Sequence, residues 1–218
     1  TPLCVFFTVK FSQPYFNVST NDVKERVKSS LNPLKPRFFE LTQENPDLYG
    51  PIWIYTTLVL VLAAAGNFAQ FMHPDSNKNA SYNYDFVPIA ATIIYGFGFV
   101  FPVLLTILLK VFGSNTSSYV QTICCYGYSL FVFIPAFILA IIPVSILQWI
   151  VICLAIASST LFLVTNYGHE LGKYVGKQRH ILIGFIGAAQ IILLLIFKLY
   201  FFATVYSGKE LDGNADVQ

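Results

Sequence analysis

The residues that could perform chemistry are few in this sequence. A weak metal or acid–base pair can be drawn from His169 and Glu170, with His180 further along the chain. An enzyme would show paired acids, a His-x-x-x-His pair, or a Ser or Cys nucleophile beside a base. None of these patterns is present, and a solvated loop explains the histidines more simply. We therefore predict no catalytic residue, no metal site and no cofactor.

The cysteines form neither a redox motif nor a disulfide pattern. They are Cys4, the adjacent Cys124 and Cys125, and Cys153. This spacing contains no Cys-x-x-Cys pair and no ladder of the kind found in secreted disulfide scaffolds. We interpret Cys124 and Cys125 as small apolar packing residues, with reversible acylation near the membrane as the alternative.

The composition is that of a membrane protein. Of the 218 residues, 56% are hydrophobic and 11% are charged, whereas soluble domains carry about 25% charged residues. The net charge of +2, from 13 basic and 11 acidic residues, is too small for a surface that neutralises nucleic-acid phosphates. We expect a lipid bilayer to surround the chain and exclude nucleic acid as its main partner.

Five apolar runs are long enough to cross a bilayer, since each crossing takes about 20 apolar residues. They predict spans at about residues 52–72, 87–109, 123–142, 146–166 and 181–204. Pro102, flanked by Gly96 and Gly98, predicts a kink in the second span. Lys198 lies near the end of the fifth span, and we expect it to snorkel to the membrane surface. The predicted fold class is an all-α bundle of five transmembrane helices.

The distribution of Lys and Arg predicts the orientation. These residues gather before the first span, between the second and third spans, and between the fourth and fifth, whereas the opposite side carries only Lys78 and Lys209. Basic residues favour the cytosolic side, so we expect a cytosolic N-terminus and a lumenal C-terminus. The chain then divides into a cytosolic segment 1–46, a membrane domain 47–206 and a short lumenal tail 207–218.

The cytosolic segment contains one predicted amphipathic helix, residues 20–31. Ser19-Thr20-Asn21-Asp22 offers N-cap chemistry, and Val23, Val27 and Leu31 follow at i, i+4 and i+8. One interpretation lays this apolar stripe on the anionic cytosolic leaflet. The other packs the stripe against the cytosolic ends of the bundle. In both interpretations Val23, Val27 and Leu31 are docking residues.

Two short strings are not explained by hydrophobicity alone. Asp47-Leu48-Tyr49-Gly50-Pro51 precedes the first span, and its Asp and Gly-Pro pair predict a tight turn at the membrane surface. Tyr126-Gly127-Tyr128-Ser129 lies in the third span, where a glycine between two tyrosines predicts close contact with a neighbouring span. We predict partner or membrane docking for Asp47, Leu48, Tyr49, Gly50 and Pro51, and a helix contact for Gly127, Tyr128, Ser129 and Pro135.

With these strings in this order, the sequence resembles the Yip domain family, the Ypt/Rab-interacting multi-spanning proteins of the early secretory pathway and Golgi. The resemblance covers most of the chain and includes Gln13-Pro14-Tyr15-Phe16 and Lys198-Leu199-Tyr200-Phe201-Phe202. It implies a non-enzymatic Golgi membrane protein, with cycling through the ER or late endosome as a further implication. It also implies partners, namely Rab GTPases and other Yip-type proteins in homo- or hetero-oligomers. Family members carry a longer tail before the Gln-Pro-Tyr-Phe string, so we expect further chain upstream.

Two functions from different classes are compatible with the sequence. The first is a scaffold or adaptor in vesicle-mediated transport, whose cytosolic face contacts trafficking proteins and membrane lipid. The alternative is a small-solute transporter or channel, suggested by the proline and glycine interruptions in the second and third spans. The scarcity of charge inside the spans opposes the alternative. Flux measured on purified protein in liposomes separates the two, because a scaffold shows no saturable transport.

Sequons offer a test of the orientation. The Asn-x-Ser/Thr sequence occurs at Asn17, Asn79 and Asn115, and glycans are added in the lumen. The predicted orientation leaves Asn17 and Asn115 in the cytosol. Asn79 is therefore the single candidate glycosylation site.

Overall fold

The computed structural model describes residues 15–34, 38–42, 45–71, 84–113, 118–142, 144–172 and 177–198. The regular elements of these ranges are helices: α2 (Thr20–Leu31), α3 (Phe38–Thr42), α4 (Tyr49–Phe71), α5 (Phe86–Val111), α6 (Tyr119–Ser129), the 3₁₀ turn η3 (Leu130–Val132), α7 (Phe133–Leu139), α8 (Ser145–Gly172) and α9 (Lys177–Ile196). Within these described ranges, five stretches are long and apolar enough to cross a membrane: Tyr49–Phe68, Phe86–Val111, Tyr119–Leu139, Ser145–Gly168 and Gln178–Ile196. The predicted all-α class and the number of spans are confirmed.

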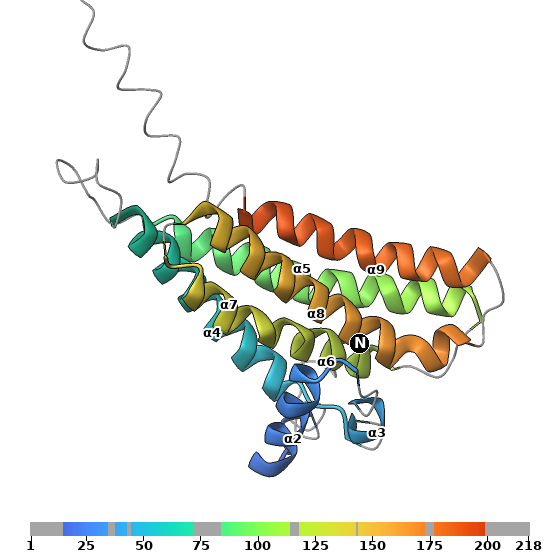
Figure 1. Cartoon of the computed structure of the whole chain (residues 1–218). Coiled ribbons are helices and arrows are strands. Elements are labelled where there is room, and N and C mark those ends of the chain that lie inside the picture. The colour runs from blue at the N-terminus through green and yellow to red at the C-terminus, as the bar shows by residue number, and fades with distance from the viewer. Residues whose placement is uncertain are drawn as a thin grey trace, which may run out of the picture.

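The spans form a bundle with α2 and α3 packed at one end. Figure 1 shows α2 and α3 beside the starts of α4 and α6, whereas α9 lies on the opposite flank of the bundle. The helix α4 packs against α5, α6 and α7, and α8 packs against both α7 and α9. The N-terminal elements are therefore fastened to the first, third and fourth spans.

The third span is interrupted where the sequence places a proline. The 3₁₀ turn Leu130–Val132 separates α6 from α7. Pro135 has no N–H to donate to the carbonyl of Phe131, and such a loss disturbs the regular helix one turn earlier. The 3₁₀ turn does not change the direction of the chain enough to divide the span. The elements α6, η3 and α7 together form one candidate crossing, Tyr119–Leu139.

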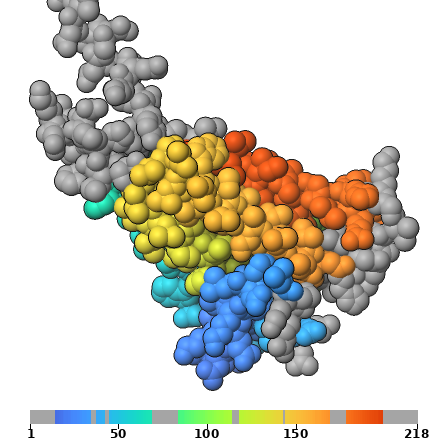
Figure 2. Space-filling model, in the orientation of Figure 1, coloured from blue at the N-terminus to red at the C-terminus, as the bar shows by residue number. Residues whose placement is uncertain are grey.

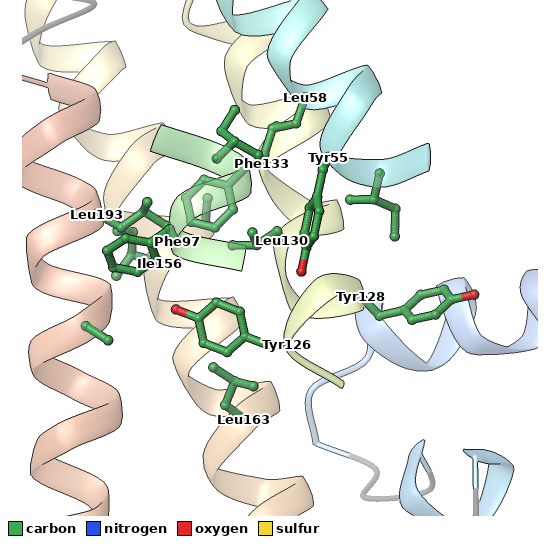
Figure 3. Packing of buried hydrophobic residues seen from close by; sticks show 14 of the residues in the cluster. Tyr55, Leu58, Phe97, Tyr126, Tyr128, Leu130, Phe133, Ile156, Leu163 and Leu193 are labelled. Carbon is green, nitrogen blue, oxygen red and sulfur yellow. The ribbon is translucent and has the colours of Figure 1, made fainter. Parts of the chain in front are cut away.

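The interior of the bundle is built from large apolar and aromatic side chains. Figure 3 shows Leu130 and Phe133 of the interrupted span between Leu58 of α4 and Leu193 of α9. A buried polar contact crosses this interior, because Gln190 Nε2 of α9 donates to Ser159 Oγ of α8 at 3.1 Å. Such contacts hold neighbouring spans together where no water is available to the polar groups.

The hydrogen bond that Pro102 removes from the second span is replaced by one from a tyrosine of the first span, and α5 is continuous through Pro102. Pro102 cannot donate to the carbonyl of Gly98, which lies four residues earlier. Tyr55 Oη of α4 donates to that carbonyl at 3.1 Å. A Cβ on Gly98 would lie 2.5 Å from Tyr55 Cζ, so only glycine leaves room for the ring.

We expect Gly98→Ala to destabilise the bundle by about 1–3 kcal/mol, because the new methyl group overpacks against Tyr55. Gly96→Ala is the matched control, since a Cβ on Gly96 meets nothing within 4 Å. The midpoint of thermal unfolding in detergent measures both variants. Equal midpoints for the two would contradict the close contact.

Lys198, at the end of the bundle opposite α2, does not reach outward as the sequence predicts. Lys198 is only 5% exposed, and its Nζ donates to Gln148 Oε1 of α8 at 3.0 Å. Gln148 Nε2 in turn donates to the carbonyls of Ala140 at 3.1 Å and Ile142 at 3.4 Å. Lys198 thus joins the ends of three spans in place of reaching outward, because Gln148 offers an acceptor that the apolar pattern does not reveal.

The helix α2 covers the residues over which the sequence predicts it. Ser19 Oγ accepts from the Asp22 N–H at 3.2 Å, and Asp22 Oδ2 accepts from the Ser19 N–H at 3.1 Å. These are the two bonds of a capping box. The hydrogen bonds to the Ser19 side chain and then to its backbone lower the pKa of the Asp22 carboxyl below its ordinary value. The charged carboxylate is therefore the form that caps the helix.

Candidate docking site: the Asp47 cluster

Asp47 is the centre of a buried group of polar contacts at the start of the first span. Its Oδ1 accepts from the Arg26 guanidinium of α2 and from Cys124 Sγ of α6, the latter at 3.3 Å. Its Oδ2 accepts from the Gly50 N–H at 2.7 Å and from Tyr128 Oη at 3.3 Å. We call Arg26, Asp47, Gly50, Cys124 and Tyr128 the Asp47 cluster. It joins α2 to the first and third spans.

The ion pair in this cluster is almost completely withdrawn from solvent. The Arg26 side chain is 3% exposed and the Asp47 side chain 1%. The second terminal nitrogen of Arg26 donates to the carbonyls of Asn45 at 2.8 Å and Leu41 at 3.3 Å. A buried charge is tolerated only when it is paired and hydrogen-bonded, and the planar fork of arginine meets several acceptors at once. Leu41 of α3 and Asn45 and Asp47 before α4 are thereby held around the guanidinium.

Two glycines allow the first and third spans to approach each other closely. A Cβ on Gly50 would lie 2.0 Å from Tyr128 Oη, and a Cβ on Gly127 would lie 2.5 Å from Pro51 Cβ. In Figure 3, Tyr126 and Tyr128 leave α6 in opposite directions, Tyr126 into the interior and Tyr128 toward α2. Gly127 between them leaves a flat surface for Pro51. The two strings singled out in the sequence thus contact each other.

A phenylalanine from α3 packs beside the Asp47 cluster and joins α3 to the third and fourth spans. Phe38 is buried, and its ring centroid lies 5.3 Å from those of Tyr128 and Phe162. The Phe38 N–H donates to Asn166 Oδ1 of α8 at 3.1 Å. Figure 2 shows the blue α2 surface seated against the yellow and orange surface of the bundle. The N-terminal elements are therefore an integral layer of the fold.

The predicted stripe of α2 is not its most buried face. Val23 is half-buried, Val27 is half-buried and packs against the core, and Leu31 is 50% exposed. The buried residues of the helix are Arg26 and Ser30. The helix therefore docks on an edge of the apolar stripe, turned so that its arginine faces Asp47.

The remaining predicted docking residues occupy different environments. The Leu48 N–H donates to the Tyr15 carbonyl at 3.0 Å, so Leu48 closes the chain onto the N-terminal segment. Tyr49 is exposed, with its ring centroid 6.1 Å from that of Trp53, which is also exposed. Gly50 and Pro51 are buried. Leu48 is half-buried, and Tyr49 is the exposed residue of the string, in the manner of an interfacial aromatic residue.

The helix-contact string is also divided. Ser129 is buried, but its Oγ donates to the Tyr126 carbonyl of its own helix at 2.6 Å. Pro135 is exposed and takes no part in the contact of Gly127 with Pro51. Asn79 and the side chains of His169 and Glu170 lie outside the described residues. Within the described part of the chain, no group of three or more metal-ligating side chains occurs.

Sequence reasoning missed Arg26, Cys124 and Phe38. Arg26 and Asp47 are 21 residues apart, and no local periodicity links them. One signal was available, because an aspartate next to an apolar span needs a cation or several donors if it is buried. The Cys124 thiol donates to the Asp47 carboxylate, but both side chains are buried, and Asp47 already accepts bonds on both oxygens. Its chemistry is that of a fastening between α2 and the bundle.

The sequence of the chain is similar to those of known proteins. The chain matches the Yip1 domain over residues 28–203. It is 39% identical to the Protein YIPF1 homolog of Dictyostelium discoideum over 198 residues, which cover 91% of this chain and 57% of that protein. It is 33% identical to Protein YIP5 of Schizosaccharomyces pombe over 130 residues, which cover 59% of this chain and 50% of that protein. The chain thus spans about half the length of these relatives, and no solved structure matches it. The match to the Yip1 domain includes residues 47–51 and 126–129, the two strings that contact each other, and the chain belongs to the Yip1 domain family.

Proposed function

We propose that this chain is a non-enzymatic scaffold or adaptor in vesicle-mediated transport at Golgi and ER membranes. It associates with Rab GTPases and with other Yip-type membrane proteins. The side of the bundle that carries α2 and α3 faces the cytosol in this proposal, because Lys and Arg outside the spans gather there. Membership of the Yip1 domain family supports a role in membrane trafficking.

The observation that carries the proposal is the buried Arg26–Asp47 pair. It fixes a short helix with a charged outer surface onto a bundle whose own surface is largely apolar. A protein partner in the cytosol needs a polar and rigid surface beside the membrane, and a docked α2 provides one. A rigid surface also spares the partner the entropic cost of ordering a free segment.

Affinity capture of the full chain from intact membranes tests the proposal. We expect Rab GTPases and other Yip-type proteins among the captured proteins, and we expect Val27→Asp to weaken capture. Val27 packs against the core, so a charge there undocks α2 while the five spans remain inserted. Asn21→Asp is the matched control, since it adds the same charge at an exposed position of the same helix. Unchanged capture by Val27→Asp at equal protein level would remove α2 from the mechanism.

Glycan mapping tests the orientation separately. The exposed Asn17 is expected to stay unmodified, because it lies on the proposed cytosolic side. The substitution Asp216→Thr turns Asn214-Ala215-Asp216 into a sequon in the tail, and we expect Asn214 to be glycosylated there. Endoglycosidase shifts on chains that carry one sequon each provide the measurement. A glycan on Asn17 or Asn115, with none on the tail, would reverse the orientation.

A further inference from the structure

The outer face of α2 carries a stripe of exposed residues that takes no part in docking the helix to the bundle. Lys24, Lys28 and Leu31 follow one another at i, i+4 and i+7, so they lie on one side of the helix. Arg26 is two residues from each lysine and therefore points to the opposite side, where it meets Asp47. All three residues of the stripe are exposed. We call Lys24, Lys28 and Leu31, together with the following Leu34, the outer stripe.

The C-terminal end of this stripe is held beside the end of a candidate span. Thr165 Oγ1 of α8 donates to the Pro33 carbonyl at 2.7 Å, and Thr165 lies in the last turn of the candidate span Ser145–Gly168. Leu34 is the residue after Pro33 and is 76% exposed. Leu34 is therefore an exposed leucine next to the end of a candidate span.

The contact between Arg26 and Asp47 also lies beside the end of a candidate span. Arg26 binds Asp47, which lies two residues before the start of α4. The exposed rings of Tyr49 and Trp53 follow at once, and tyrosine and tryptophan gather at the membrane–water interface. The middle of α2, at Arg26, and the residues that follow the helix, at Pro33, are thus tied to residues beside the ends of candidate spans.

We propose that the outer stripe binds the phosphate groups of anionic lipids in the leaflet beside it. The ammonium groups of Lys24 and Lys28 meet the phosphates, while Leu31 and Leu34 enter the acyl boundary. Glu25 lies about 100° around the helix from Lys24 and about 60° from Lys28, beside the stripe and not in it. The stripe contains two lysines and no acidic residue, so its own charge is positive. Lipid is favoured over a protein as the occupant because the exposed Leu34, like the exposed rings of Tyr49 and Trp53, lies beside the end of a candidate span. The side of α2 that carries the exposed Glu25 is left for a protein partner.

A fluorescent label at Leu34 tests this proposal without any protein partner. The full chain carries Leu34→Cys, with Cys4→Ser and Cys153→Ser to remove other reactive thiols, and an NBD group is attached. It is reconstituted into vesicles of phosphatidylcholine with or without phosphatidylserine. We expect NBD emission to shift to the blue and iodide quenching to fall when phosphatidylserine is present. Emission typical of water in both vesicles, with full iodide quenching, would overturn the proposal.

Charge reversal on the stripe supplies the second arm. We expect Lys24→Glu/Lys28→Glu to abolish the response to phosphatidylserine, because each basic residue near an anionic surface contributes about 1 kcal/mol, or about fivefold in binding. Arg179→Glu is the matched control, since Arg179 is exposed at the start of α9 on the same side of the membrane. A response that survives the double reversal would overturn the role of the lysines. Protection of the label only after addition of a purified Rab GTPase would assign the stripe to a protein partner.

Discussion

Replacing Arg26 with alanine is expected to release α2 from the bundle. Asp47 would keep a buried charge without its counterion, and breaking a buried pair in this way costs about 3–5 kcal/mol. Backbone hydrogen exchange of the full chain in nanodiscs measures the effect directly. We expect the amides of α2 to lose protection while the amides of α5 and α9 keep theirs, because these spans do not contact the Asp47 cluster through any of its hydrogen bonds.

Three further variants distinguish an ion pair from a general loss of packing. Lys24→Ala changes the same helix at an exposed position and is expected to alter stability by no more than about 0.5 kcal/mol. Arg26→Lys is not expected to restore protection, since a lysine cannot reach Asp47 and the Asn45 carbonyl with one planar fork. The exchange Arg26→Asp/Asp47→Arg is also expected to fail, because the donors Gly50, Cys124 and Tyr128 would then face a cation. Wild-type protection of α2 in Arg26→Ala would contradict the fastening role of the pair.

The architecture of the bundle is largely readable from local patterns. Apolar length predicts the number of spans because a bilayer imposes a minimum length on each crossing. The cap at Ser19 and the spacing of Val23 and Val27 predict where α2 begins and how far it runs. These features depend on residues close together in the sequence. They require no knowledge of how the helices are arranged.

The rotation of α2 could not be obtained from the same patterns. Hydrophobic periodicity points Val23, Val27 and Leu31 toward either the membrane leaflet or the bundle, yet the most buried position of α2 is Arg26. A single buried guanidinium with bonds to Asp47, Leu41 and Asn45 outweighs the modest gain from burying one more leucine. Only the positions of the acceptors, which come from another part of the chain, decide that balance.

The sequence predicts that Gly127 makes a close helix contact, but it does not predict which residue Gly127 contacts. A glycine between two tyrosines indicates a close approach, because each neighbour fills one side of the helix and leaves a gap between them. Several spans could have filled that gap. Pro51 does so because Gly50, next to it, gives space to Tyr128 at the same time. Each string supplies the glycine that the other requires.

The second large effect is expected from substitutions at this paired contact. A Cβ on Gly127 would lie 2.5 Å from Pro51 Cβ and 3.0 Å from Pro51 Cα, and a backbone atom cannot move aside cheaply. We expect Gly127→Ala to lower the free energy of unfolding by about 1–3 kcal/mol or more through overpacking. Gly127→Leu is expected to leave little folded protein. Size-exclusion profiles in detergent and thermal unfolding midpoints provide the measurements, with Gly184→Ala as the control at a helix position where a Cβ meets nothing within 4 Å.

The reciprocal position gives the same contact a stricter test. A Cβ on Gly50 would meet Tyr128 at Oη, Cζ and Cε2, the nearest at 2.0 Å, and these are side-chain atoms that a smaller residue lacks. Gly50→Ala alone is expected to be strongly destabilising, whereas Gly50→Ala with Tyr128→Leu is expected to be little worse than Tyr128→Leu alone. Such non-additivity is typical of two residues in direct contact. Strictly additive losses would mean that Gly50 is needed for the backbone turn after Asp47 and not for the ring of Tyr128.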